Sequence, residues 1–150
     1  MYYSGMNDVA ANQTPPGTSS ALFSVLNAAH ALENKLEATL VGVGLSMAKF
    51  SVLTELVNAP KPLTLGDLAA RVSCVRSNMT QLIDRLEADG LVRRVQCPTD
   101  RRSVHAQITE TGRARQADAA AELEKLDAEF AAVVREEDWI AINRLAKAVR

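Results

Sequence analysis

The sequence has no apolar run close to the roughly 18 residues that a membrane-spanning helix needs, so we expect no membrane partner. Residues 1–17, MYYSGMNDVAANQTPPG, have neither a basic start nor an apolar core, which argues against a secretory signal. Only two cysteines are present, without metal-type spacing, and they do not make a disulfide scaffold. Together these absences predict a cytoplasmic protein in a reducing compartment.

Groups that could support catalysis or hold a cofactor are also scarce. His30 and His105 have no cysteine or carboxylate pattern near them, so we predict no metal site. A nucleophilic role for Cys74 or Cys97 beside His105 lacks a third group to orient the pair. The chain has no glycine-rich phosphate loop. The sequence therefore predicts neither an enzyme nor a bound cofactor.

Charge is distributed unevenly along the chain, whose 150 residues suffice for one domain with a real core. Hydrophobic residues make up 47% and charged residues 23%, which is typical of a folded protein. The net charge is −1, yet residues 61–115 have ten basic and six acidic side chains, whereas residues 1–60 have two and four. Residues 116–150 have five and eight. Positive charge concentrated in one segment is typical of a surface that binds phosphates.

Helices are predicted on both sides of this basic segment. Residues 1–18 are polar and without period, which predicts a flexible arm, and residues 19–150 form the single folded domain. Apolar side chains recur every three or four residues over 19–44 and again over 110–150, where a charged interruption divides two helices of about 110–134 and 137–149. We assign both flanks to dimerisation, with Trp139 as a core or interface anchor.

The central residues, 45–109, have the element order of a winged helix-turn-helix. Ser46 and Thr64 are expected N-caps of two helices, because their side-chain oxygens can accept a free backbone N–H of the first turn. A third helix is expected from about Val75 to Asp89, where Gly90 stops it. The predicted fold class is mainly α (α+β): a winged helix-turn-helix DNA-binding module with flanking dimerisation helices.

A basic hairpin follows the third helix. Residues 91–96 and 103–108 alternate in part and predict two antiparallel strands. The turn between them places Arg101 and Arg102 near its tip, which can enter a minor groove where narrow A·T tracts concentrate negative potential. Asp100 would repel phosphate, so we expect it to pair with an arginine and hold the shape of the tip.

Polar side chains gather on the outer face of the third helix. Ser77, Asn78, Gln81 and Arg85 share that face, beside Arg76. Asparagine and glutamine each donate and accept a hydrogen bond, which suits the edge of adenine in the major groove. Any one of them could instead be an ordinary surface residue, but together they favour DNA contact.

Three stretches resemble the MarR family of winged-helix transcription regulators: LTLGDLAARV, RSNMTQLIDRLEADGLVRR and PTDRRSVHAQITETG. The most specific feature is Asp-x-Arg at the wing, Asp100 and Arg102, followed by T-x-x-G from Thr109 to Gly112. Flanking helices of the right number and order extend the resemblance over about residues 20–150.

The resemblance implies a homodimer that binds double-stranded DNA. In this family the first and last two helices interlock, the recognition helix enters the major groove and the wing enters the minor groove. It also implies a repressor of a palindromic operator, released by a small, often aromatic or anionic, ligand. Carried over by position, the DNA-binding residues are Arg76, Ser77, Asn78, Thr80, Gln81 and Arg85 in the recognition helix and Asp100, Arg101 and Arg102 on the wing.

Effectors of this family bind between the dimer helices and the winged module. His30, Met47 and Phe50 could line such a crevice, although a buried core role is an equal alternative for each. The ligand would act by favouring a half-site spacing that does not fit the operator.

The chain departs from the family at the start of the recognition helix. Many relatives have a capping serine where this chain has Val75, so the cap must move to Ser73 or Ser77 or be absent. Cys74 fills the neighbouring slot, and Cys97 lies at the base of the wing among arginines that could lower its pKa. A thiol-based redox regulator that uses Cys97 or Cys74 is therefore one alternative function, and a winged-helix protein-interaction module is another.

Overall fold

The computed structural model describes residues 18–73, 75–96 and 103–148. The elements in chain order are α1 (Thr18–Gly42), α2 (Met47–Asn58), β1 (Leu63–Thr64), α3 (Leu65–Arg71), α4 (Arg76–Ala88), β2 (Val92–Gln96), β3 (Val104–Ile108), α5 (Glu110–Val133) and α6 (Glu136–Ala148). The chain divides into two compact units, Met1–Asn34 and Lys35–Arg150, and the second holds every element from α2 onward. The expected mainly helical class is confirmed, and β1 is an addition.

Side-chain caps fix where α2 and α3 begin. The Ser46 hydroxyl accepts the Lys49 backbone N–H at 3.3 Å, and the Thr64 hydroxyl accepts the Asp67 N–H at 3.0 Å. Both N-caps are as the sequence predicted. Glu37 adds a contact that the sequence did not reveal, because its carboxylate accepts the Met47 N–H at 2.9 Å. That bond ties the end of α1 to the start of α2.

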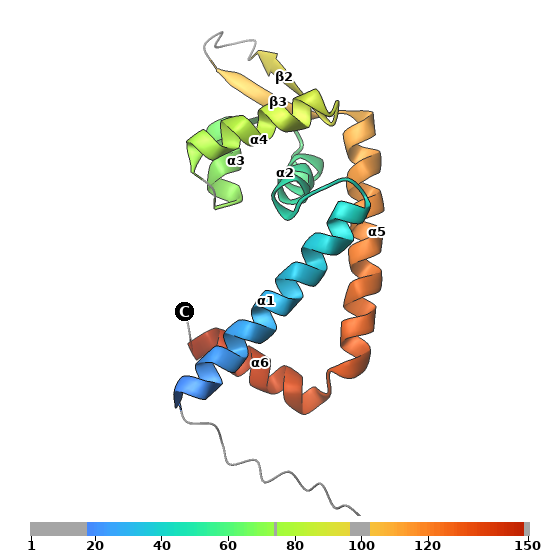
Figure 1. Cartoon of the computed structure of the whole chain (residues 1–150). Helices are drawn as coiled ribbons and strands as arrows, with labels where there is room; N and C mark the ends of the chain where they lie inside the picture. The colour runs from blue at the N-terminus through green and yellow to red at the C-terminus, as the bar shows by residue number, and fades with distance from the viewer. Residues whose placement is uncertain (1–17, 74, 97–102, 149–150) are drawn as a thin grey trace, which may run out of the picture. The chain divides into compact units, whose positions relative to one another are not determined.

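The sheet has three antiparallel strands in the order β1-β3-β2. Val92 pairs with Ile108 and Arg94 with Ala106 in the wing hairpin, and Leu63 pairs with the far side of Ala106 (Figure 1). The two-residue strand β1 is too short to show any alternation in the sequence. It forms because Leu63 is buried and its backbone lies against β3.

The core lies between α2, α3, α4 and the sheet. Its buried side chains are apolar and come from every element of the winged module: Val52, Leu53 and Leu56 from α2, Leu68 and Ala69 from α3, Met79, Ile83 and Leu86 from α4, and Leu63, Val92, Ala106 and Ile108 from the strands. Burying one such leucine, isoleucine or methionine stabilises the fold by about 1.5–3 kcal/mol. Because α4 contributes three of them along one edge, its opposite face must point to solvent.

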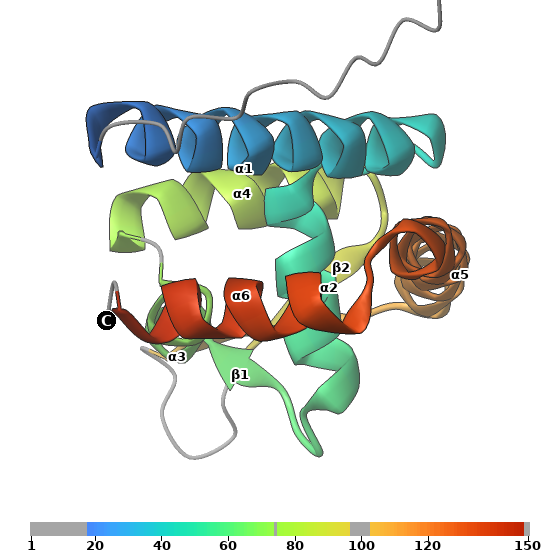
Figure 2. The ribbon, with the colours of Figure 1, turned by 90° about the horizontal axis from the view of Figure 1, so that it is seen from below.

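Helix α5 runs beside α2 (Figures 1 and 2). The Gln116 amide donates to the Thr54 hydroxyl at 3.3 Å, and the Arg115 guanidinium donates to the Val43 carbonyl at 3.1 Å. Ala119 on the same helix is fully buried. These contacts attach the first half of α5 to the winged module, while α6 begins at the other end of α5.

Thr109 and Gly112 form the junction at which α4, β2 and α5 meet. The Thr109 hydroxyl donates to the Gly90 carbonyl at 2.7 Å and accepts the Gly112 N–H at 3.0 Å, so it caps α5 and holds the turn after α4. A Cβ on Gly112 would lie 2.0 Å from the Leu91 carbonyl oxygen. The T-x-x-G motif therefore allows the backbone at the start of α5 to contact the backbone at Leu91.

Large apolar side chains are exposed on α1 and α6, among them Leu22, Phe23, Trp139 and Ile140. Trp139 is 58% exposed, which excludes the core alternative for this residue within a single chain. Within the described residues no single helix is long and apolar enough to cross a membrane; residues 21–42 of α1 pass that test only jointly with α2, as a bent pair.

We expect Gly112→Ala to lower the free energy of unfolding by about 1–3 kcal/mol or more, because the new methyl group overlaps backbone that cannot move aside. Urea denaturation measures the change. Gly42→Ala is the matched control, since nothing lies within 4 Å of a Cβ there. Equal stability of the two variants would show that the junction is not tightly packed.

Candidate nucleic-acid interface

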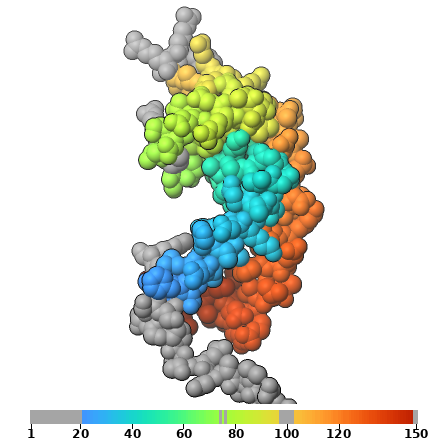
Figure 3. All heavy atoms as spheres, in the orientation of Figure 1, coloured from blue at the N-terminus to red at the C-terminus, as the bar shows by residue number. Residues whose placement is uncertain are grey.

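The outer face of α4 is polar and solvent-exposed. Ser77, Asn78, Gln81 and Arg85 are all exposed, as is Thr80, whereas Met79 and Ile83 between them are fully buried. The face expected from the sequence is therefore presented together, over the yellow-green surface of α4 in Figure 3. Arg76 is the first residue of this helix.

The start of α4 has no side-chain cap. Val75 is the N-cap residue and has an extended conformation. Its apolar side chain accepts no backbone N–H of the first turn. Ser73, two residues earlier, has φ 52°, a left-handed conformation that costs a residue other than glycine free energy. Of the three options that the sequence left open, neither Ser73 nor Ser77 is the cap residue. The helix begins at Arg76, one residue from the predicted start.

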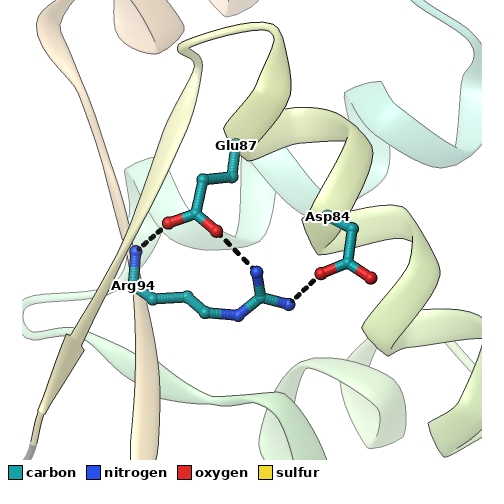
Figure 4. A network of polar contacts seen from close by, with 3 residues as sticks. All are labelled: Asp84, Glu87 and Arg94. Carbon is teal, nitrogen blue, oxygen red and sulfur yellow. Dashed lines mark hydrogen bonds and ion pairs between the residues drawn. The ribbon is translucent and has the colours of Figure 1, made fainter.

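A three-residue ion-pair cluster joins α4 to the wing strand β2 (Figure 4). The Arg94 guanidinium donates to Glu87 and to Asp84, each at 2.5 Å, and the Glu87 carboxylate also accepts the Arg94 backbone N–H at 3.0 Å. Glu87 thus holds both the backbone and the side chain of one strand residue. The cluster fixes β2 against the last two turns of α4.

The cluster favours the charged forms of Glu87 and Arg94. The Arg94 backbone N–H, and then its guanidinium, lower the pKa of Glu87 below its usual value. Burial of the Arg94 guanidinium acts to lower its own pKa, but the hydrogen bonds to Asp84 and Glu87 outweigh that effect and raise the pKa. The cluster therefore stays intact at neutral pH.

The acidic residues of α4 are all paired with basic ones. Asp84 and Glu87 bind Arg94, and Asp89 at the C-cap binds the Lys49 ammonium at 2.6 Å. Among the described side chains of α4, this leaves Arg85 as the charged group outside any ion pair that the structure records. Pairing reduces the negative charge that would otherwise face an approaching polyanion.

The base of the wing has one further basic contact. The Arg93 guanidinium donates to the Gln107 amide oxygen at 2.9 Å, and the two residues lie opposite each other on the paired strands β2 and β3. The predicted wing-tip residues Asp100, Arg101 and Arg102 lie outside the described residues, as do Cys74 and Cys97. Arg94, one of the arginines near Cys97 in the sequence, binds Asp84 and Glu87 of α4.

Met47 and Phe50 line a groove between α2 and the end of α3. The other lining residues are Ser51, Thr54, Glu55, Arg71, Val72 and Ser73, and the groove has a volume of about 340 Å³. The Arg71 guanidinium binds the Glu55 carboxylate at 3.2 Å across it. We call this the α2–α3 groove. His30, predicted to share such a site, lies in the other compact unit, where its ring is exposed beside Glu33.

Residues 45–104 match the family model described as "MarR family". Over these residues the chain is similar to the MarR family. The family consists of DNA-binding transcription regulators and not of enzymes, and the three-stranded sheet and helices found here are those of its winged-helix structures.

The chain is similar to three known proteins, one by sequence and two by solved structure. It is 39% identical over 69 residues to YkoM of Bacillus subtilis, an uncharacterised HTH-type transcriptional regulator, and the match covers 46% of this chain and 44% of YkoM. The match therefore spans less than half the length of that relative. AbsC, a MarR-family transcriptional regulator from Streptomyces coelicolor, is 26% identical with a TM-score of 0.75 over 87% of this chain and 90% of its own.

The third is the transcriptional repressor CouR of Rhodococcus jostii, whose structure was determined bound to a 23-mer DNA duplex. The TM-score is 0.73 and the identity 27%, over 85% of this chain and 91% of CouR. Both solved structures cover the flanking helices as well as the winged module.

Sequence reasoning found the polar face of α4 but missed the cluster that supports it. It did not single out Arg94, whose guanidinium binds α4 to the wing strand. The available signal was the spacing of Asp84 and Glu87, which are three residues apart and so share one side of a helix. Their partner could not be chosen among several arginines without the pairing of β2.

We expect Val75→Ser to raise the free energy of unfolding by about 1 kcal/mol relative to Val75→Ala, because a serine hydroxyl can accept a first-turn N–H that the valine side chain cannot. Val75 is 62% exposed, so neither substitution hollows the core. Urea denaturation of the two variants and the parent chain provides the measurement. If the serine and alanine variants are equally stable, the first turn of α4 does not respond to a cap.

Proposed function

We propose that this chain is a sequence-specific, DNA-binding transcription regulator that acts in the cytoplasm as a homodimer. The observation that carries the proposal is the exposed polar face of α4, whose acidic neighbours are all held in ion pairs with Arg94 or Lys49. An uncharged or acidic surface would not favour DNA over a protein partner. A face of amides, hydroxyls and an arginine, beside carboxylates that are held in ion pairs, favours DNA.

Asn78 and Gln81 read base edges in the major groove in this proposal. Their amides donate and accept together, which matches the paired groups of adenine. Ser77, Thr80, Arg76 and Arg85 contact phosphates or neighbouring bases and set the register. Arg101 and Arg102 enter the adjacent minor groove, and Asp100 holds their shape. The CouR complex with duplex DNA supports this use of the fold.

Dimerisation follows from the apolar side chains that the single chain leaves exposed. Leu22, Phe23 and Leu26 on α1 and Trp139 and Ile140 on α6 are more than half exposed. A soluble protein gains free energy by covering so many large apolar groups, about 25 cal/mol per Å². A second copy covers them with two-fold symmetry, and a two-fold dimer requires a palindromic operator.

In this proposal the protein represses transcription, and a small aromatic or anionic ligand relieves the repression. The α2–α3 groove is one place for such a ligand, because its volume is at the lower end of the range for small-molecule sites, about 300–1,000 Å³. It is lined by Met47 and Phe50 and extends to Ser73, immediately before the recognition helix. A ligand that favours another position of this turn would move α4 away from the operator. His30 stays a predicted contributor.

The proposal is tested by selecting bound sequences from random duplex DNA. We expect a palindrome whose half-sites are about 10 base pairs apart. Asn78→Ala or Gln81→Ala should relax base preference at defined positions, at about 1–3 kcal/mol for the lost contact. Arg101→Ala should weaken all sequences alike and reduce the salt dependence of binding. Failure to enrich any sequence, with affinity unchanged in all three variants, would favour the protein-interaction module instead.

Oligomeric state is the second test. We expect light scattering to give twice the chain mass of 16.2 kDa, and Leu145→Glu on the exposed face of α6 to reduce the dimer fraction, because a carboxylate would be buried without a partner. Lys61→Glu, an exposed substitution in the loop before β1, is the matched control. A parent chain that stays monomeric at high concentration would contradict the dimer.

A further inference from the structure

Asp84 lies on the same stripe of α4 as two residues proposed to contact DNA. Ser77, Gln81 and Asp84 are separated by four and three residues, which places them on one side of a helix. All three are exposed. A free carboxylate in this position would face the phosphates of any duplex that the stripe approaches.

The two carboxylates of the cluster are held differently by Arg94. Glu87 makes two bonds, to the backbone N–H and to the guanidinium of Arg94, so it anchors the strand. Asp84 makes one bond, at 2.5 Å, and its side chain is more exposed than that of Glu87. Asp84 therefore adds little anchoring that Glu87 does not already supply. What the Asp84 bond changes most is the charge that α4 presents to solvent.

We propose that Arg94 is a positioning residue of the DNA interface: bound to Glu87 it sets the wing strand against the recognition helix, and bound to Asp84 it cancels a carboxylate on the DNA-reading stripe. The inference rests on the proposed function. Arg94 itself does not touch DNA in this scheme, because its guanidinium is occupied by the two carboxylates.

The cluster carries one positive and two negative charges, a net charge of −1, spread over three side chains. Replacing Arg94 by glutamine changes this to −2 and leaves Asp84 without its partner. Replacing Asp84 by asparagine in the same protein returns the cluster to −1. Asp84→Asn raises the net charge of the cluster by one in either background, but only without Arg94 does it remove a carboxylate that has lost this partner, so its effect on DNA binding should be larger when Arg94 is absent.

The test is a double-mutant cycle on binding to the selected operator, measured with the full chain at fixed salt. We expect Arg94→Gln to weaken binding about tenfold and Asp84→Asn alone to change it less than about twofold. In the Arg94→Gln background, Asp84→Asn should recover about threefold or more. Arg94→Lys should lose less than Arg94→Gln, because the ammonium keeps the charge but not the paired geometry.

Arg93→Gln is the matched control, since it removes one positive charge from the same strand and, among the described residues, disturbs the contact with Gln107 rather than one with α4. Asp84→Asn should not rescue Arg93→Gln. Thermal unfolding of each variant separates binding from stability: rescue of affinity by Asp84→Asn without a parallel rise in Tm marks cancellation of charge at the interface.

An additive cycle, or equal rescue of the Arg93 and Arg94 variants, overturns the inference while the parent protein still binds its operator and the proposed function stands. A parent chain that binds no duplex overturns both. If Arg94→Gln is too unstable to assay, Arg94→Lys with and without Asp84→Asn supplies the same comparison, and additivity there counts equally against the inference.

Discussion

The close approach between α5 and the turn after α4 is the constraint on which the rest of the structure depends. Gly112 lies so near the Leu91 carbonyl that a single methyl group would not fit, and Thr109 bonds to both the turn and the first turn of α5. The contacts at Thr109 and Gly112 fix the positions of α4, the wing hairpin and the long helix α5 relative to one another. A displacement of α5 therefore reaches the polar face of α4 through backbone contacts, which deform little.

Ion pairs and apolar packing together hold α4 in place. The buried edge of α4 orients the helix, but burial alone would leave three acidic groups on or beside its exposed surface. Arg94 and Lys49, from the wing strand and from α2, bind them. The same bonds that attach α4 to its neighbours also remove negative charge from it. The same ion pairs therefore both position the helix and reduce the negative charge on its surface.

The order of helices and hairpin strands could be predicted from the sequence because each depends on local signals. Apolar side chains repeat every three or four residues in the helices, Ser46 and Thr64 supply caps, and Gly90 ends α4. Strand β1 could not be predicted, because two residues carry no period and its pairing with Ala106 is formed across 43 positions of the chain. The polar face of α4 was predictable for the same local reason as the helix itself.

The sequence by itself determined which residues of α4 point outward, since helical periodicity assigns a side chain to a face without knowledge of any neighbour. Only the tertiary structure decided how that face is supported. Several arginines follow α4 in the sequence, and the one that binds Asp84 and Glu87 is chosen by the register of β2 against β3 and by the turn at Gly90. Partners brought together by pairing and packing have no fixed sequence spacing, so no local pattern reveals them.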